Sequence, residues 1–411
     1  MPHAFHPRSI KAAALIGSGL ASFARTKRSA EAAILTFHGL RSGLGDRTIL
    51  DWSLHLPVEV FRCTCALLAK DYHVISLADL IAARTHGTRL PDNAVVITFD
   101  DGYASNYELA YPILQEFDLH ATIFVATGFL DGVEMFWFQR MDLALGRTQK
   151  ELLDWKINGK KLRLYLGTYE LRQQSLMRLL PELKSLPDVD LLGEVDRLEE
   201  ALEVREPGFD DLPQVMRPMT WEMASEMSLS GHVDIGGHTH THPILARCNT
   251  LAMRAEIATC RERIHAEIGE LPIAFAYPNG GTDDYTRETL MLVQEAGFKA
   301  ACTTVCGRIT DNASLYQLPR YGSPESVWEA EATVSGAFET LKDWRQKCLK
   351  AISMISRRSR LTRLTRCCCP PGNRPVLSRL RGPCLRLHMT GGRWCCTSLT
   401  ASAAVARRPC S

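Results

Sequence analysis

The stretch AVVITFDDGY, residues 94–103, runs from apolar, β-branched residues into two adjacent acidic residues and a glycine. Similar short apolar runs recur along the chain, and segments with a helical pattern separate them. Continuous apolar strands that alternate with helices are typical of a parallel sheet or barrel. The predicted strands are 32–37, 94–99, 121–126, 232–237, 273–278 and 299–305.

The helices between these strands are recognisable from their ends. In the clearest one, Asn249 can cap the start and Gly269 the finish. The stretch 131–218 breaks the alternation, because it is charged and reads as mostly helical. We interpret it as an insertion that either shapes a substrate cleft or only packs against the barrel. The predicted helices of the alternating part are 57–71, 104–117, 249–269 and 283–297.

Charge and cysteine divide the 411 residues unevenly. Residues 1–343 hold 33 basic against 46 acidic residues, a net charge of −13, which argues against a nucleic-acid binder. Residues 344–411 hold 15 Lys and Arg, no acid and eight of the 14 cysteines. We expect a basic, Cys-rich tail at 346–411 that is disordered or non-native. A tail that binds a membrane or polyanion is the alternative.

The N-terminal segment, residues 1–30, precedes the predicted domain at 31–345. Its apolar part, residues 11–24, resembles a signal-peptide core, but the basic residues 25–28 follow at once and oppose export. No run of about twenty apolar residues exists, so no ordinary transmembrane span is predicted. We expect a helical or loosely ordered segment and a cytoplasmic protein. The alternative is export or membrane association through this segment. The sequence does not indicate an oligomeric state.

Two adjacent carboxylates follow the strand at 94–99. In parallel α/β folds, the active site lies at the C-terminal ends of the strands, where Asp100 and Asp101 stand. Adjacent side chains on an extended chain point in opposite directions, so one carboxylate can bind a metal while the other does something else. Capping of the next helix is the alternative, but one aspartate would suffice for that.

The stretch GHTHTHPIL, residues 237–245, holds three histidines after another predicted strand. An extended backbone would point His238, His240 and His242 to one face. On a helical turn, only His238 and His242 would share a face. A catalytic zinc site needs about three protein ligands and an open position, and Asp101 with two histidines supplies that set.

The motifs TFDDGY, HTHTHP and FAYPNG, in this order, resemble those of polysaccharide deacetylases, carbohydrate esterase family 4 with its NodB-type domain. The stretch ILTFHGL (34–40) resembles the first strand of one branch of this family. The resemblance covers about residues 31–322, with the insertion inside. It implies a distorted (β/α)7 barrel of about seven parallel strands.

The resemblance also implies a metal site. The family pattern His-[Ser/Thr]-x-x-His makes His238 and His242 metal ligands together with Asp101, and leaves His240 out. It implies one divalent metal, Zn2+ by default, with Co2+, Ni2+ or Mn2+ as alternatives. Asp100 resembles the family's general base.

Further site residues are suggested by the third motif, FAYPNG, and by positions where this chain differs from the family pattern. The backbone N–H of Asn279, beside Pro278, is expected to hold the oxyanion. Where many members carry an arginine, this chain has Ala276, and Arg320 is the candidate substitute. Tyr103 is a further candidate substrate contact.

The family's late Leu-x-His motif, which supplies the acid, is missing. His38 at the end of the first strand is the candidate catalytic histidine, and a core histidine is the alternative. The aromatic residues 136–138 are expected either to stack on sugar rings or to lie in the core.

The predicted function is therefore metal-dependent removal of N-acetyl groups from a polysaccharide, oligosaccharide or glycolipid, in cell-envelope or exopolysaccharide metabolism. An N-acetylated glycan is the expected partner. An O-acetyl esterase, a metal-dependent phosphoesterase and a non-catalytic sugar-binding relative are the alternatives.

Overall fold

The computed structural model describes residues 7–43, 48–205, 208–350, 389–390 and 393–394. The chain divides into two compact units, Met1–Gln346 and Lys347–Ser411. Most of the predicted tail lies outside the described residues. The described part of the tail includes two short antiparallel strands, β12 (Met389–Thr390) and β13 (Arg393–Trp394).

A seven-stranded sheet forms the centre of the first unit, in the order β1-β5-β6-β9-β10-β11, with β4 paired to β5. Every ladder in it is parallel. All six predicted strands are present, and the prediction missed only β4. The strands are β1 (Ala33–Phe37), β4 (His73–Val74), β5 (Ala94–Phe99), β6 (Ala121–Val125), β9 (Val233–Gly237), β10 (Ala274–Ala276) and β11 (Ala300–Cys302).

A short segment, residues 318–321, lies between the two edge strands of this sheet, β11 and β1, and hydrogen-bonds to both. The Leu318 N–H donates to the Ala301 carbonyl beside β11 at 2.9 Å, and the Tyr321 N–H donates to the Ile34 carbonyl of β1 at 2.8 Å. The curved sheet is thereby closed into a distorted barrel, as predicted. Arg320 lies in this closing segment.

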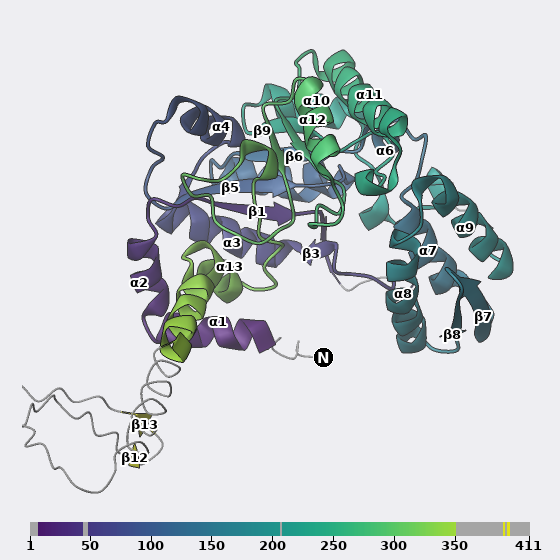
Figure 1. Ribbon diagram of the computed structural model, residues 1–411, viewed down its shortest axis with the longest axis horizontal. Coiled ribbons are helices and arrows are strands. Elements are labelled where there is room, and N and C mark those ends of the chain that lie inside the picture. The colour runs from purple at the N-terminus through teal and green to yellow at the C-terminus, as the bar shows by residue number, and fades with distance from the viewer. Residues whose placement is uncertain (1–6, 44–47, 206–207, 351–388, 391–392, 395–411) are drawn as a thin grey trace, which may run out of the picture. The chain divides into compact units, whose positions relative to one another are not determined.

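Helices surround the sheet (Figure 1). The helix at 250–268 begins and ends as predicted, because Asn249 caps its first turn and Gly269 has a left-handed backbone. A π-helical turn, η1 (Asn106–Ala110), precedes α5. The helices are α3 (Val58–Asp71), α4 (Leu77–His86), α5 (Tyr111–Glu116), α6 (Thr127–Leu130), α10 (Trp221–Leu229), α11 (Thr250–Ile268), α12 (Arg287–Glu295) and α13 (Val327–Val334).

The insertion has an apolar core of its own, built mainly from leucines such as Leu164, Leu179 and Leu198. The prediction that it is mostly helical is wrong for residues 152–165, which form an antiparallel hairpin. The reason is the two-residue turn Asn158-Gly159, with φ of 50° and 74°, a left-handed conformation that joins strands and interrupts a helix. The elements are α7 (Trp137–Arg147), β7 (Leu152–Ile157), β8 (Lys160–Tyr165), α8 (Tyr169–Lys184) and α9 (Asp188–Ala201).

The N-terminal segment forms two helices, α1 (Pro7–Gly17) and α2 (Leu20–Lys27). Small residues such as Ala12 and Ala24 are buried against Ala332 and its neighbours at α13. In the part of the chain that the structure describes, no helix has the length and apolarity needed to span a bilayer.

Candidate metal centre and active site

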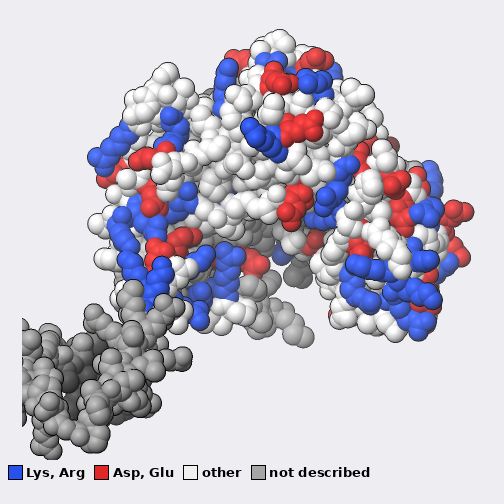
Figure 2. All heavy atoms as spheres, in the orientation of Figure 1, with Lys and Arg blue, Asp and Glu red and all other residues white. Residues whose placement is uncertain are grey.

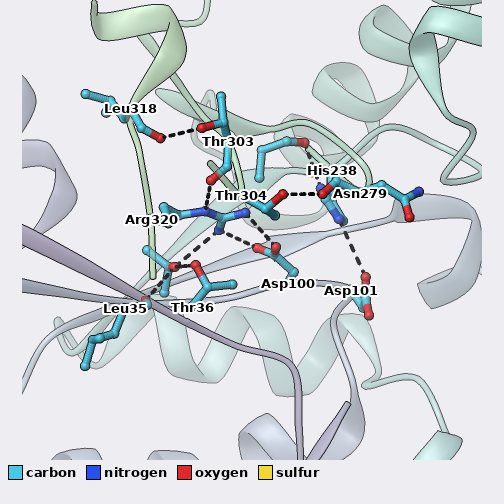
Figure 3. A network of polar contacts seen from close by, with 12 residues as sticks. Leu35, Thr36, Asp100, Asp101, His238, Asn279, Thr303, Thr304, Leu318 and Arg320 are labelled. Atoms are coloured by element: carbon cyan, nitrogen blue, oxygen red, sulfur yellow. Dashed lines mark hydrogen bonds and ion pairs between the residues drawn. The ribbon is translucent and has the colours of Figure 1, made fainter. Parts of the chain in front are cut away.

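The two adjacent aspartates lie directly after β5, at the C-terminal end of the barrel. Both are buried, and Asp101 has a left-handed backbone with φ of 76°. The Asp100 N–H still donates to the Phe37 carbonyl of β1 at 2.9 Å. The change of backbone direction at Asp101 separates the two carboxylates, which contact different partners (Figure 3).

The histidine loop, residues 238–242, follows β9 and is neither extended nor helical. Thr239 and His242 have left-handed backbones, with φ of 67° and 63°. This conformation brings the imidazoles of His238 and His242 to 4.8 Å between ring centroids. The side chain of His240 is directed elsewhere, and its Nδ1 hydrogen-bonds the Thr127 hydroxyl at 2.8 Å.

Asp101, His238 and His242 converge from two strand ends. Asp101 Oδ1 lies 3.6 Å from His238 Nε2 and 3.5 Å from His242 Nε2. Two donor atoms of a tetrahedral zinc site are about 3.4 Å apart, so the spacing suits an ion between these atoms better than direct hydrogen bonds. Among the described residues, this is the one group of three such side chains that could hold a metal ion.

Neighbouring groups prepare the two imidazoles for that role. His238 Nδ1 donates to the Ala276 carbonyl at 2.7 Å, which leaves Nε2 facing Asp101. Burial and the adjacent His238 lower the pKa of His242 to about 3, so its ring is neutral, the form that binds metals. Burial alone would raise the pKa of Asp101, but the adjacent imidazoles, above all that of His238, hold it well below its ordinary value.

Asp100 is paired with Arg320. Arg320 Nη1 and Nη2 donate to the two carboxylate oxygens at 2.8 and 2.7 Å, and its Nε donates to the Thr303 carbonyl at 2.9 Å (Figure 3). Both side chains are buried. Burial would raise the pKa of Asp100, but the Arg320 guanidinium outweighs it, so the pKa lies below its ordinary value. The carboxylate is therefore a fixed anion. Its role as a base remains a prediction.

His38 is half-buried at the end of β1. The Asn106 amide donates to its carbonyl at 2.7 Å, and the Leu40 N–H donates to the Ser105 hydroxyl at 2.9 Å. Both partners stand at the π-helical turn that follows the aspartates, a feature often found at functional sites. His38 is close enough to lower the pKa of both Asp100 and Asp101 electrostatically.

Tyr103 is fully buried behind the carboxylates rather than at the surface. Burial and the nearby negative charge of Asp101 hold the pKa of Tyr103 well above its ordinary value. The Gln139 amide also donates to its hydroxyl, at 3.4 Å. Its contact with substrate stays a prediction.

Asn279 stands beside the candidate metal centre (Figure 3) in a left-handed turn, with φ of 57°. Its carbonyl accepts a hydrogen bond from the Thr304 hydroxyl at 2.6 Å, and the Pro278 carbonyl accepts one from the Gly280 N–H. No described residue accepts the Asn279 N–H. This donor is the one that the sequence analysis assigned to an oxyanion.

The aromatic residues 136–138 lie near the start of the insertion, at the beginning of α7. Phe136 is buried and lies 4.9 Å from the His242 ring, while Trp137 belongs to the core of the insertion. Phe138 is half-buried, stacks on Phe136 and lies 5.7 Å from His242. Packing against the candidate ligand His242 therefore accounts for Phe136, and Phe138 is the ring of this group that stays partly exposed at the site.

Sequence reasoning missed two residues beside the site. His55 is buried, and its ring meets Tyr103 edge-on at 5.1 Å; burial and His38 lower its pKa to about 4. Glu256, on α11, binds the histidine loop. Neither belongs to a local motif. For His55, the available signal was the alternation of apolar and polar residues at 52–57, which indicates the short strand β3 (His55–Pro57).

Comparison with known proteins agrees with this site. A family profile described as polysaccharide deacetylase matches residues 87–152 and 199–301. The putative polysaccharide deacetylase YxkH of Bacillus subtilis is 31% identical over 102 residues, 25% of this chain and 34% of that protein. The poly-β-1,6-N-acetyl-D-glucosamine N-deacetylase of Escherichia coli K12 is 50% identical over 46 residues, 11% of this chain and 7% of that protein. The chain thus spans about a third or less of these curated relatives.

A solved structure shares the fold. The Streptococcus pyogenes deacetylase PplD in complex with acetate matches with a TM-score of 0.50 and 17% identity, over 74% of this chain and 98% of that one. The profile match falls on both sides of residues 153–198, in the middle of the insertion, and includes the aspartate pair and the histidine loop. Both segments that carry the candidate site thus match the polysaccharide deacetylase family.

Proposed function

We propose that this protein is a metal-dependent hydrolase that removes N-acetyl groups from a glycan. The observation that carries the proposal is the convergence of Asp101, His238 and His242 beside a separate carboxylate, Asp100, that a buried arginine holds as an anion. The short match to a poly-β-1,6-N-acetyl-D-glucosamine N-deacetylase supports an N-acetylglucosamine polymer of the cell envelope or an exopolysaccharide as substrate.

The donor set of one carboxylate and two imidazoles fits a divalent ion such as Zn2+. When bound, that ion would supply Lewis acidity toward the acyl oxygen and a nucleophilic water at neutral pH. In the proposed reaction, Asp100 takes a proton from the attacking water. Arg320 keeps this carboxylate charged and oriented through its two hydrogen bonds.

Two other groups complete the proposed chemistry. The Asn279 N–H donates a hydrogen bond to the oxyanion that forms as water adds to the amide carbon. The C–N bond then breaks, and the leaving amine takes a proton from His38, the half-buried imidazole at the end of β1. The products are acetate and a free amino sugar.

The test is metal analysis of the purified protein followed by acetate release from N-acetylglucosamine oligomers, β-1,4- and β-1,6-linked. We expect about one divalent ion per chain and acetate formed in equal amount with new amine. If the protein instead releases acetate only from O-acetylated sugars, and no new amine forms, it is an O-acetyl esterase. A metal-loaded protein that releases no acetate but hydrolyses phosphate esters would contradict it.

A further inference from the structure

The histidine loop needs an external restraint. Two of its residues, Thr239 and His242, have left-handed backbones, which is unfavourable for residues with a side chain and most of all for a β-branched threonine. The Thr239 hydroxyl donates to the His238 carbonyl and accepts the His242 N–H at 3.0 Å. This internal bond links the two candidate ligands but leaves the middle of the loop, His240 and Thr241, without support.

Glu256 supplies that support from α11. One carboxylate oxygen, Oε2, accepts the N–H groups of His240 and Thr241, both at 2.8 Å. The other oxygen, Oε1, accepts the Thr241 hydroxyl at 2.8 Å. One half-buried side chain therefore satisfies three donors of two consecutive loop residues. Its helix is anchored close by, since Ile257 and Cys260 are buried in the core.

The turn after β6 holds the other side of the loop. The Thr127 N–H donates to the Thr239 carbonyl at 3.2 Å, and the Gly128 N–H donates to the His240 carbonyl at 2.8 Å. A Cβ at Gly128 would lie 2.9 Å from that carbonyl oxygen, so the two backbones approach closely. The carbonyls of Thr239 and His240 thus face the start of α6, whereas the N–H groups of His240 and Thr241 face Glu256.

We propose that Glu256 is a positioning residue of the metal centre, which holds His238 and His242 at the spacing that a metal ion requires. This inference rests on the proposed metal site. Partners behind metal ligands typically change metal affinity or activity about 10- to 100-fold when they are removed. Glu256 acts one step further back, on the backbone between two ligands, and touches no ligand side chain.

Three substitutions of Glu256 test the proposal. Glu256→Ala removes all three acceptors and is expected to weaken Zn2+ binding about 10- to 100-fold. Glu256→Asp keeps the charge but is shorter by one methylene, so it should weaken binding as well. Glu256→Gln keeps the length and one oxygen for the two N–H groups and should recover most of the affinity. Glu262→Ala, at an exposed position of the same helix, is the control and should bind as the unaltered protein does.

Zn2+ affinity is measured by competition with a chelator, and amide hydrogen exchange of His240 and Thr241 is measured in the metal-free full chain. Faster exchange at these two amides in Glu256→Ala, together with weaker Zn2+ binding, would support the proposal. Unchanged affinity and exchange in Glu256→Ala, or a Glu256→Gln as weak as Glu256→Ala, would overturn it. If Glu256→Ala fails to fold by circular dichroism, Glu256→Asp with native affinity overturns it instead. An unaltered protein that binds Zn2+ but releases no acetate would contradict the proposed function and leave this inference standing.

Discussion

The strand ends of the barrel and the insertion both bury an aspartate, but in opposite electrostatic states. Asp100 is paired with Arg320, and its pKa lies below the ordinary value. Asp142, on α7 of the insertion, accepts hydrogen bonds from the N–H groups of Leu50 and Asp51, at 2.8 and 2.7 Å, and has no cationic partner among the described residues. Burial raises its pKa to about 7 in spite of them. A buried carboxylate thus stays charged where a cation is built in beside it.

The backbone and the surface show the same contrast. The candidate site has left-handed, non-glycine residues at Asp101, Thr239, His242 and Asn279. In the insertion, the left-handed non-glycine residues are Asn158, in the hairpin turn, and Glu203, just after α9. Charged side chains of the insertion lie mostly on its surface, with both signs visible in Figure 2, over an apolar core. We infer that changes at the strand ends affect chemistry, and stability as well where a buried charge loses its partner, whereas changes in the insertion affect stability alone.

The largest effect is expected from the three candidate ligands. Asp101→Ala, His238→Ala or His242→Ala should each remove the bound metal and the activity together, because each removes a third of the donor set. His240→Ala is the matched control from the same loop and should keep its metal. Metal content per chain and acetate release measure both. Full metal content in His238→Ala would refute the ligand assignment and break the contrast between the two regions.

The second-largest loss of activity is expected from Asp100→Asn. Loss of the proposed base is expected to lower kcat by about 10²- to 10⁴-fold, while metal content stays unchanged because Asp101 is intact. Substantial turnover in this variant would remove Asp100 as the base, and Arg320 would then hold a carboxylate with a structural role.

Arg320→Met should destabilise the fold by about 3–5 kcal/mol, because it leaves a buried carboxylate without its cation. The lowered pKa of Asp100 means that the stability from this pair is present above the pKa of an unfolded aspartate. It is lost as the pH falls through the folded pKa. Without Arg320 the pKa should rise, so the acidic limb of the kcat/KM profile should move to higher pH. Denaturant unfolding and a pH–rate profile check both effects; an unmoved acidic limb would contradict this account.

Asp142→Asn tests the insertion in the opposite direction. Since the folded pKa of about 7 lies above that of an unfolded aspartate, the native state binds a proton more tightly, and the free energy of unfolding falls as pH rises toward 7. The variant should lose this dependence, which is on the order of a few kcal/mol between pH 4 and 7. Urea unfolding across this range is the measurement. If the unfolding free energy falls equally with pH in Asp142→Asn and in the unaltered protein, Asp142 is not the group that titrates. Zn2+ affinity should not change.

The smallest effect is expected at the hairpin turn. Gly159 has φ of 74°, and a Cβ there would meet no atom within 4 Å. A substitution therefore costs only the free energy of placing a residue with a side chain in a left-handed backbone. Gly159→Ala should therefore cost about 1 kcal/mol of unfolding free energy. Metal content and acetate release should be those of the unaltered protein. A loss of activity here would show that the insertion does more than pack.

Local pattern accounted for most of the fold, because β-branched apolar runs and capped helices report their own structure. It failed at residues 152–165, where the charged, leucine-rich composition suggested a helix although Asn158-Gly159 makes a turn. It also failed at the two-residue strand β4, which is too short to show a pattern. Both failures lie in segments whose conformation depends on a turn or on a neighbouring strand.

The sequence by itself determined the parallel α/β architecture, the two aspartates at one strand end and the histidine loop at another, because each is a pattern within a few residues. Only the tertiary structure decided that His238 and His242 face Asp101, that Arg320 reaches Asp100 across 220 residues, and that Glu256 holds the loop. Barrel closure and helix packing create these contacts, and no local pattern encodes which distant side chain will be buried against a given charge.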